Sequence, residues 1–126
     1  MKVVVMLAAA SFVTASFVSL PAQSLEQETA VQSTTAQGAA LAKASRCYAC
    51  HDPSAVLIGP PYQAIAARYS GDRKMMESVL TKKVILGGGG NWGDVPMVPN
   101  EHVKPTDALT IVRWILDQAP GKKTPN

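Results

Sequence analysis

The chain has 126 residues, which is room for one domain of modest size. Its formal net charge of +3 is spread along the sequence without an acidic or basic block, which argues against a nucleic-acid-binding surface. There are only two cysteines, and both lie in one short motif, so a disulfide framework is excluded.

The first 22 residues have the pattern of a secretory signal peptide. Lys2 supplies a short positive region, an apolar stretch runs from Val3 to Leu20, and Ala22 suits the last position before a cut. We therefore expect export and cleavage of residues 1–22, which would leave no membrane span. The alternative is an uncleaved anchor, because Val3–Leu20 is about the minimum length of a span.

Two polar segments flank a central domain. Residues 23–35 are expected to form a flexible tail or tether, and a mere remnant of processing explains them equally well. The C-terminal residues 119–126 are expected to fray. Between them, residues 36–118 show helical segments, long loops and no alternating strands, which predicts an all-α domain of about four helices.

The first and last helices of the domain are expected to pack on each other. Residues 36–45 are rich in alanine, and Gly38 among them indicates either a tight helix crossing or a frayed first turn. The last helix is expected over residues 105–118, because Pro105 suits a first helical position and a broad apolar stripe containing Trp114 follows it.

The segment from Cys47 to His51 reads Cys-x-x-Cys-His, the attachment signature of a c-type haem. Two thiols at this spacing lie on one turn, so each can add to one haem vinyl group, and the histidine that follows can bind the iron. A redox dithiol and half of a zinc site are the alternatives. No βαβ pattern supports the first, and two Cys with two His are too few for the second.

A stiff loop, Gly59-Pro60-Pro61-Tyr62, precedes a helix expected over residues 63–69. A histidine that binds iron needs its other ring nitrogen held, usually by a backbone carbonyl, and the prolines can fix such a carbonyl in place. Pro61 also suits the first turn of the helix. The two interpretations are compatible.

The third helix is expected to begin at Asp72, a good N-cap residue, and to end at the glycine run 87–90. Its buried face is predicted to carry four apolar side chains, which are Met75, Met76, Val79 and Leu80. The glycine run lacks the Lys and Ser/Thr of a phosphate-binding loop. We expect it to be a flexible connector that packs close to the haem edge.

Residues 91–100 are too rich in proline and glycine for a helix. Met97 lies between Pro96 and Pro99, which is a rigid way to hold a thioether at a fixed point, and this makes it the candidate sixth iron ligand. His102 is the other candidate, although a histidine in a surface loop is more often simply solvated.

Taken in order, these motifs resemble those of a class I monohaem cytochrome c of the small bacterial type, over about residues 36–118. They are Cys47-x-x-Cys50-His51, Gly59-Pro60-x-Tyr62, Trp92-Gly93-x-Val95-Pro96-Met97-x-Pro99-Asn100, and the final helix with Trp114. The resemblance implies helices wrapped round one haem, with the terminal helices crossing. Val98 departs from the family pattern, which commonly has a proline there.

The resemblance also implies the roles of individual residues. One haem c would be bound covalently through Cys47 and Cys50, with His51 and Met97 as axial iron ligands and the Pro60 carbonyl accepting a hydrogen bond from the His51 ring. Three further residues would support the cofactor: Lys83 and Trp92 as partners of a haem propionate, and Asn100 as a support for the Met97 sulfur.

We therefore expect a periplasmic one-electron carrier of a respiratory chain, not an enzyme, that docks transiently with redox partner proteins at the haem edge. It would be a monomer or a subunit of a redox complex, and a bound subunit of a periplasmic dehydrogenase is the main alternative. A haem enzyme or gas sensor with a labile sixth ligand is the other alternative, and Met97 in its proline-held loop argues against it.

Overall fold

The computed structural model describes the backbone of residues 23–121 and the side chains of residues 33–121. Over this range the fold is helical, and its only strand-like pairing is an isolated bridge between Gly88 and Met97. The elements are α1 (Gln23–Ala44), the 3₁₀ helix η1 (Cys47–Ala49), α2 (Tyr62–Arg68), α3 (Arg73–Leu86) and α4 (Pro105–Leu116). The expected all-α class is confirmed.

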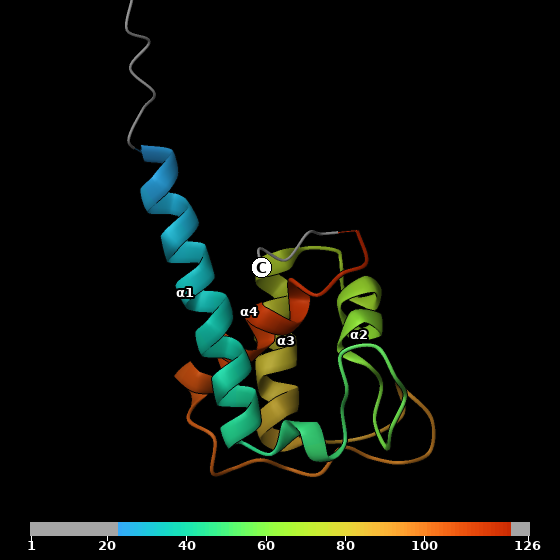
Figure 1. Cartoon of the computed structure of the whole chain (residues 1–126). Coiled ribbons are helices and arrows are strands. Elements are labelled where there is room, and N and C mark those ends of the chain that lie inside the picture. The colour runs from blue at the N-terminus through green and yellow to red at the C-terminus, as the bar shows by residue number, and fades with distance from the viewer. Residues whose placement is uncertain (1–22, 122–126) are drawn as a thin grey trace, which may run out of the picture.

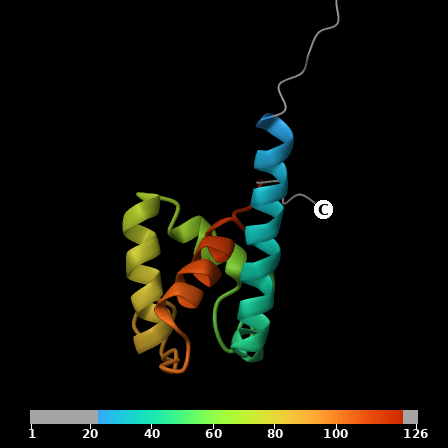
Figure 2. The ribbon, with the colours of Figure 1, turned by 90° about the vertical axis from the view of Figure 1, so that its left-hand side faces the viewer.

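Helix α4 is the centre of the fold and packs against α1, α2 and α3 (Figures 1 and 2). It starts at Pro105, as predicted, and its apolar stripe lies in the core. Its buried side chains are Ala108, Ile111, Val112, Trp114, Ile115 and Leu116. Because α4 packs on three helices through this one buried face, it fixes the positions of α1, α2 and α3 relative to one another.

The terminal helices α1 and α4 cross closely at Gly38. A Cβ atom on Gly38 would overlap the Cβ of Trp114 and would lie 3.1 Å from the carbonyl oxygen of Thr110. Only glycine allows this approach, so the predicted tight crossing is confirmed and the alternative of a frayed first turn is excluded.

Helix α1 begins 13 residues earlier than the sequence predicted, at Gln23 instead of residue 36. Residues 23–35, which were expected to form a flexible tail or tether, are therefore helical. A helix that is already nucleated by packing extends at little cost, because each added residue brings one hydrogen bond, and residues 23–37 contain neither Gly nor Pro. The first turns of α1 extend beyond the other helices (Figures 1 and 2).

The expected leader, residues 1–22, and the last residues, 122–126, lie outside the described residues. None of the helices within the described range is long and apolar enough to cross a membrane.

Helix α3 starts as predicted but buries a different face. Asp72 caps it, with its side chain accepting a hydrogen bond from the Met75 backbone N–H at 2.8 Å. The buried residues are Leu80 and Val84, whereas Met75 and Val79 are 55 % and 49 % exposed. The prediction that four apolar residues form the buried face of α3 was therefore wrong for Met75 and Val79. Leu80 and Val84 are four residues apart and so lie on one face of α3, and both also line the cavity described below.

An ion-pair network joins α3 to α4 at the surface. The Arg73 guanidinium donates to Glu77 at 2.8 Å and to Asp117 at 2.8 Å, and the Arg113 Nε donates to the second Glu77 oxygen at 3.0 Å. Partial burial raises the pKa of Glu77, but the hydrogen bonds from Arg73 and Arg113 outweigh it and hold that pKa below its ordinary value. The ionised carboxylate is therefore the form that stabilises the fold.

We expect Glu77→Gln to lower the free energy of unfolding by about 1–2 kcal/mol at pH 7, because it removes the charge from two ion pairs. A depressed folded-state pKa gives stability that is fully present above the unfolded value of about 4.5 and lost as the pH falls through the folded value. Urea unfolding should therefore show that wild type and Glu77→Gln differ in free energy of unfolding at pH 7 and become similar at pH 3. Asp94→Asn, on an exposed loop, is the matched control, and an equal loss in both variants would contradict a role for the network.

Candidate haem-binding site

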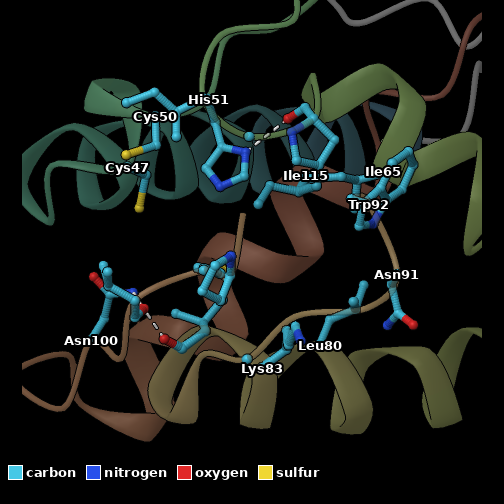
Figure 3. A pocket seen from close by; sticks show the side chains of 18 of the residues that line it. Cys47, Cys50, His51, Ile65, Leu80, Lys83, Asn91, Trp92, Asn100 and Ile115 are labelled. Carbon is cyan, nitrogen blue, oxygen red and sulfur yellow. Dashed lines mark hydrogen bonds between the residues drawn. The ribbon is translucent and has the colours of Figure 1, made fainter. Parts of the chain in front are cut away.

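A cavity of about 590 Å³ lies between η1, α2, α3, α4 and the long loop after α3. Its lining is mostly apolar, and the apolar wall includes Ile65, Leu80, Val84, Ile111 and Ile115. Figure 3 shows Cys47, Cys50 and His51 on one wall and Lys83 and Asn100 across from them. The structure therefore brings residues far apart in the sequence to one space.

Cys47 begins η1 and Cys50 is its C-cap, and both sulfur atoms lie at one end of the cavity (Figure 3). Arg46 enters this turn in the left-handed region, at φ 63°. The backbone N–H groups of Cys50 and His51 both donate to the Cys47 carbonyl, at 3.2 and 3.0 Å. This tight turn presents both thiols and the imidazole to the same cavity, and both thiols are free of disulfide.

Neither alternative use of the cysteines is supported. Burial raises the pKa of the Cys47 thiol, whereas a redox-active dithiol needs a lowered pKa. A zinc site needs further ligands, and within the described residues no group of three or more His, Cys, Asp or Glu side chains is placed to hold a metal ion.

The His51 imidazole is held in one orientation from two sides. Its Nδ1 lies 2.8 Å from the Pro60 carbonyl, which can only accept, so Nδ1 carries the proton and Nε2 is left as a free ligand atom. Its ring also stacks on Tyr62, with centroids 5.7 Å apart and planes 21° apart. A Cβ on Gly59 would lie only 2.5–3.1 Å from three atoms of the imidazole, so this position must be glycine.

Tyr62, which the sequence marked only as a motif residue, is the centre of an aromatic cluster. It is 1 % exposed and makes edge contacts with Trp114 at 4.9 Å and with Tyr48 at 5.6 Å. Trp114 is in turn the residue that α1 crosses at Gly38. The crossing of the terminal helices is therefore connected by direct packing to the ring of His51.

Met97 lines the same cavity and is half-buried against the core. Its backbone pairs with Gly88 through two hydrogen bonds, of 2.8 and 3.1 Å. Gly87, at φ 68°, leaves no space for a side chain, because a Cβ there would overlap the Met97 carbonyl and lie 2.8 Å from the Pro99 nitrogen. The glycine run was expected to be a flexible connector close to the haem edge. Gly88, Gly89 and Gly90 do line the cavity, and Gly87 and Gly88 also anchor the methionine loop.

Asn100 makes hydrogen bonds to the backbone of both α3 and the methionine loop. Its side-chain amide nitrogen donates to the Val84 and Val98 carbonyls, both at 3.1 Å. The backbone N–H of Asn100 donates to the Ile85 carbonyl at 3.0 Å. Asn100 thus ties the methionine loop to the end of α3, and its support of the Met97 sulfur stays a prediction.

Lys83 and Trp92 line the cavity, and Trp92 lies toward the end away from the cysteines, next to Asn91 (Figure 3). The Lys83 ammonium lies 3.1 Å from the position that a Cβ on Gly88 would take. His102 is exposed but also lines the cavity, so the second candidate for a distal ligand is present in the same space.

These features fit a c-type haem. The donor set consists of two thiols on one turn, an imidazole with a free Nε2 and a thioether, around an apolar space. The close approach of Gly59 to the His51 ring and of Gly87 to the methionine loop shows that both ligand-bearing segments are positioned by backbone contacts.

Comparison with known proteins agrees with this geometry. The family model for cytochrome c matches residues 35–119. The chain is 47 % identical over 76 residues to cytochrome c-551 of Allochromatium vinosum, covering 60 % of this chain and 80 % of that protein. It is 43 % identical over 76 residues to cytochrome c-552 of Hydrogenobacter thermophilus, covering 60 % of this chain and 76 % of that one.

The crystal structure of Nitrosomonas europaea cytochrome c552 has a similar fold, with a TM-score of 0.61 at 39 % identity, covering 64 % of this chain and 98 % of that one. The family match, the fold and the residues that line the cavity all indicate a haem-binding cytochrome. The chain therefore belongs to the cytochrome c family, as a small class I monohaem cytochrome c, and is an electron-transfer protein and not an enzyme.

Proposed function

We propose that this chain is a periplasmic one-electron carrier whose haem is attached through Cys47 and Cys50 and ligated by His51 and Met97. The observation that carries the proposal is that all four side chains line one cavity. When bound, the haem supplies a one-electron Fe(III)/Fe(II) couple, and His/Met ligation raises its reduction potential.

The protein's part is to hold both ligands still. The Pro60 carbonyl and the Tyr62 ring fix the His51 imidazole, and the Gly88 bridge fixes the backbone of Met97. Ligands that do not move between the two oxidation states keep the reorganisation cost of electron transfer small. Two filled axial positions would also leave no place for oxygen or peroxide, which supports a carrier.

Transient docking at the cavity mouth is supported by exposed aliphatic side chains. Ile58, Val95 and Val98 line the cavity. Val56 and Leu57, next to Ile58 in the same loop, are 75 % and 51 % exposed. A small apolar patch of this kind suits a weak and brief encounter with a redox partner.

Export is supported by the signal-peptide pattern of residues 1–22 and by covalent haem attachment, which in bacteria is completed outside the cytoplasm.

Mass spectrometry of the exported protein tests the attachment. We expect the mass of one chain plus one haem, retained after extraction with acidified acetone, and one electron per chain in a coulometric titration. Cys47→Ala together with Cys50→Ala should lose the haem on extraction, because no thioether remains. Each single variant should keep it through one thioether and show the shifted haemochrome spectrum of a remaining vinyl group. Haem retention by the double variant would refute the proposed attachment.

A further inference from the structure

The end of α2 contacts the cavity wall through Arg68, a residue that the sequence motifs did not single out. The Arg68 guanidinium carbon lies 4.7 Å from the centroid of the Trp92 indole, over its face. Tyr69, the next residue, approaches the same indole with centroids 6.5 Å apart. Within the described part of the chain no carboxylate forms an ion pair with Arg68, so the indole is its defined partner.

This contact lies at a defined end of the cavity. The vinyl groups and the propionates of a haem project from opposite halves of the macrocycle, so cysteines that bind the vinyl carbons place the propionates at the far end. Figure 3 shows Trp92 and Asn91 at that far end. This step depends on the covalent attachment that we propose above.

Trp92 needs such support because its own loop gives it little. It is 38 % exposed, and it lies in the stretch 88–95, which contains Gly88, Gly89, Gly90 and Gly93. A cation over an indole face is worth about 0.5–1 kcal/mol at an exposed site, which favours one ring orientation by about twofold to fivefold. Arg68 is the last residue of α2 and Tyr69 is its C-cap, so both provide a fixed point for this glycine-rich loop.

We propose that Arg68 positions Trp92 at the propionate end of the haem and, through its charge there, raises the reduction potential. The sign follows from electrostatics: reduction adds one negative charge to the cavity, and a nearby cation favours the more negative state. The Trp92 ring is the structural part of this role, and the guanidinium charge is the electrostatic part.

Three holoprotein variants separate these parts. Arg68→Gln removes the charge and the cation over the ring, and Arg68→Lys keeps the charge but not the planar guanidinium. Lys74→Gln removes one exposed cation on α3, outside the cavity lining, and is the matched control. The readouts are the midpoint potential and the hydrogen-exchange rate of the Trp92 indole N–H by NMR.

For Arg68→Gln we expect the ratio of oxidised to reduced protein at a fixed potential to rise about threefold. This corresponds to a midpoint potential lower by about 28 mV, at 59 mV per tenfold. The Trp92 indole N–H should also exchange faster. Arg68→Lys should recover most of the potential but not the slow exchange, and Lys74→Gln should change neither. Equal shifts of potential in Arg68→Gln and Lys74→Gln, or unchanged indole exchange in Arg68→Gln, would overturn the inference. A wild-type protein that released its haem on acid extraction would instead overturn the proposed function beneath it.

Discussion

Replacing Met97 by alanine is expected to convert the haem iron from a six-coordinate low-spin centre to one that binds CO readily when reduced. The variant removes the thioether that lines the cavity from the loop after α3. A Met/His ligand pair raises the reduction potential, so its loss should lower the midpoint potential. We expect the ratio of oxidised to reduced protein at a fixed potential to rise by about a hundredfold or more, which is about 120 mV for one electron. Absorption spectra with and without CO, and a redox titration, measure both effects.

Two comparisons make the Met97 result specific. Met75→Ala removes an equivalent side chain from the exposed face of α3, where it is 55 % exposed, and should leave spectrum and potential unchanged. His102→Ala tests the second distal candidate, which lines the same cavity. If His102→Ala disturbed the wild-type spectrum and Met97→Ala did not, the sixth ligand would be His102 and our assignment would be wrong.

A methyl group added at Gly59 is expected to lower the free energy of unfolding of the holoprotein by about 2 kcal/mol, within the range for overpacked sites. The new Cβ would meet Cε1, Nδ1 and Nε2 of His51 at 2.5, 2.8 and 3.1 Å. The ring cannot turn away without losing its hydrogen bond to Pro60 and its stacking on Tyr62. Denaturant unfolding followed by haem absorption gives the change in stability.

Gly71→Ala is the matched control for this substitution. A Cβ on Gly71 would meet nothing within 4 Å, and its φ is not in the left-handed region. We expect it to be neutral or to stabilise by a few tenths of a kcal/mol, because it restricts the unfolded chain. Equal effects of the two alanines would show that the closeness of Gly59 to the imidazole is unimportant for stability.

The sequence predicted the parts of the fold that depend on local rules. The N-cap at Asp72, the start of α4 at Pro105 and the close crossing at Gly38 are all confirmed, because each follows from the chemistry of one residue type. The chain also contains the motifs in the family's order, which made the helical cytochrome c fold predictable.

What the sequence did not predict depends on long-range packing. Four apolar residues on α3 cannot show which of them face α4, and Met75 and Val79 proved exposed. The pairing of Gly88 with Met97 joins residues nine apart through backbone groups that any residue carries. The contact of Arg68 with Trp92 joins the last residue of α2 to a residue of the loop after α3, and no sequence pattern relates the two positions.

The start of α1 shows a different limit. Composition alone favoured a polar tail over residues 23–35, but helix extension depends on whether a neighbouring turn is already formed. Packing of α1 on α4 supplies that turn, and the helix continues back to Gln23.

The most direct test of His51 and Met97 as the two axial ligands is the absorption spectrum of the exported wild-type protein, oxidised and reduced, before and after CO. We predict a low-spin spectrum in both oxidation states, a methionine–iron charge-transfer band when oxidised, and no change on adding CO. A high-spin oxidised spectrum, or rapid CO binding by the reduced protein, would contradict the assignment and with it the function as an electron carrier.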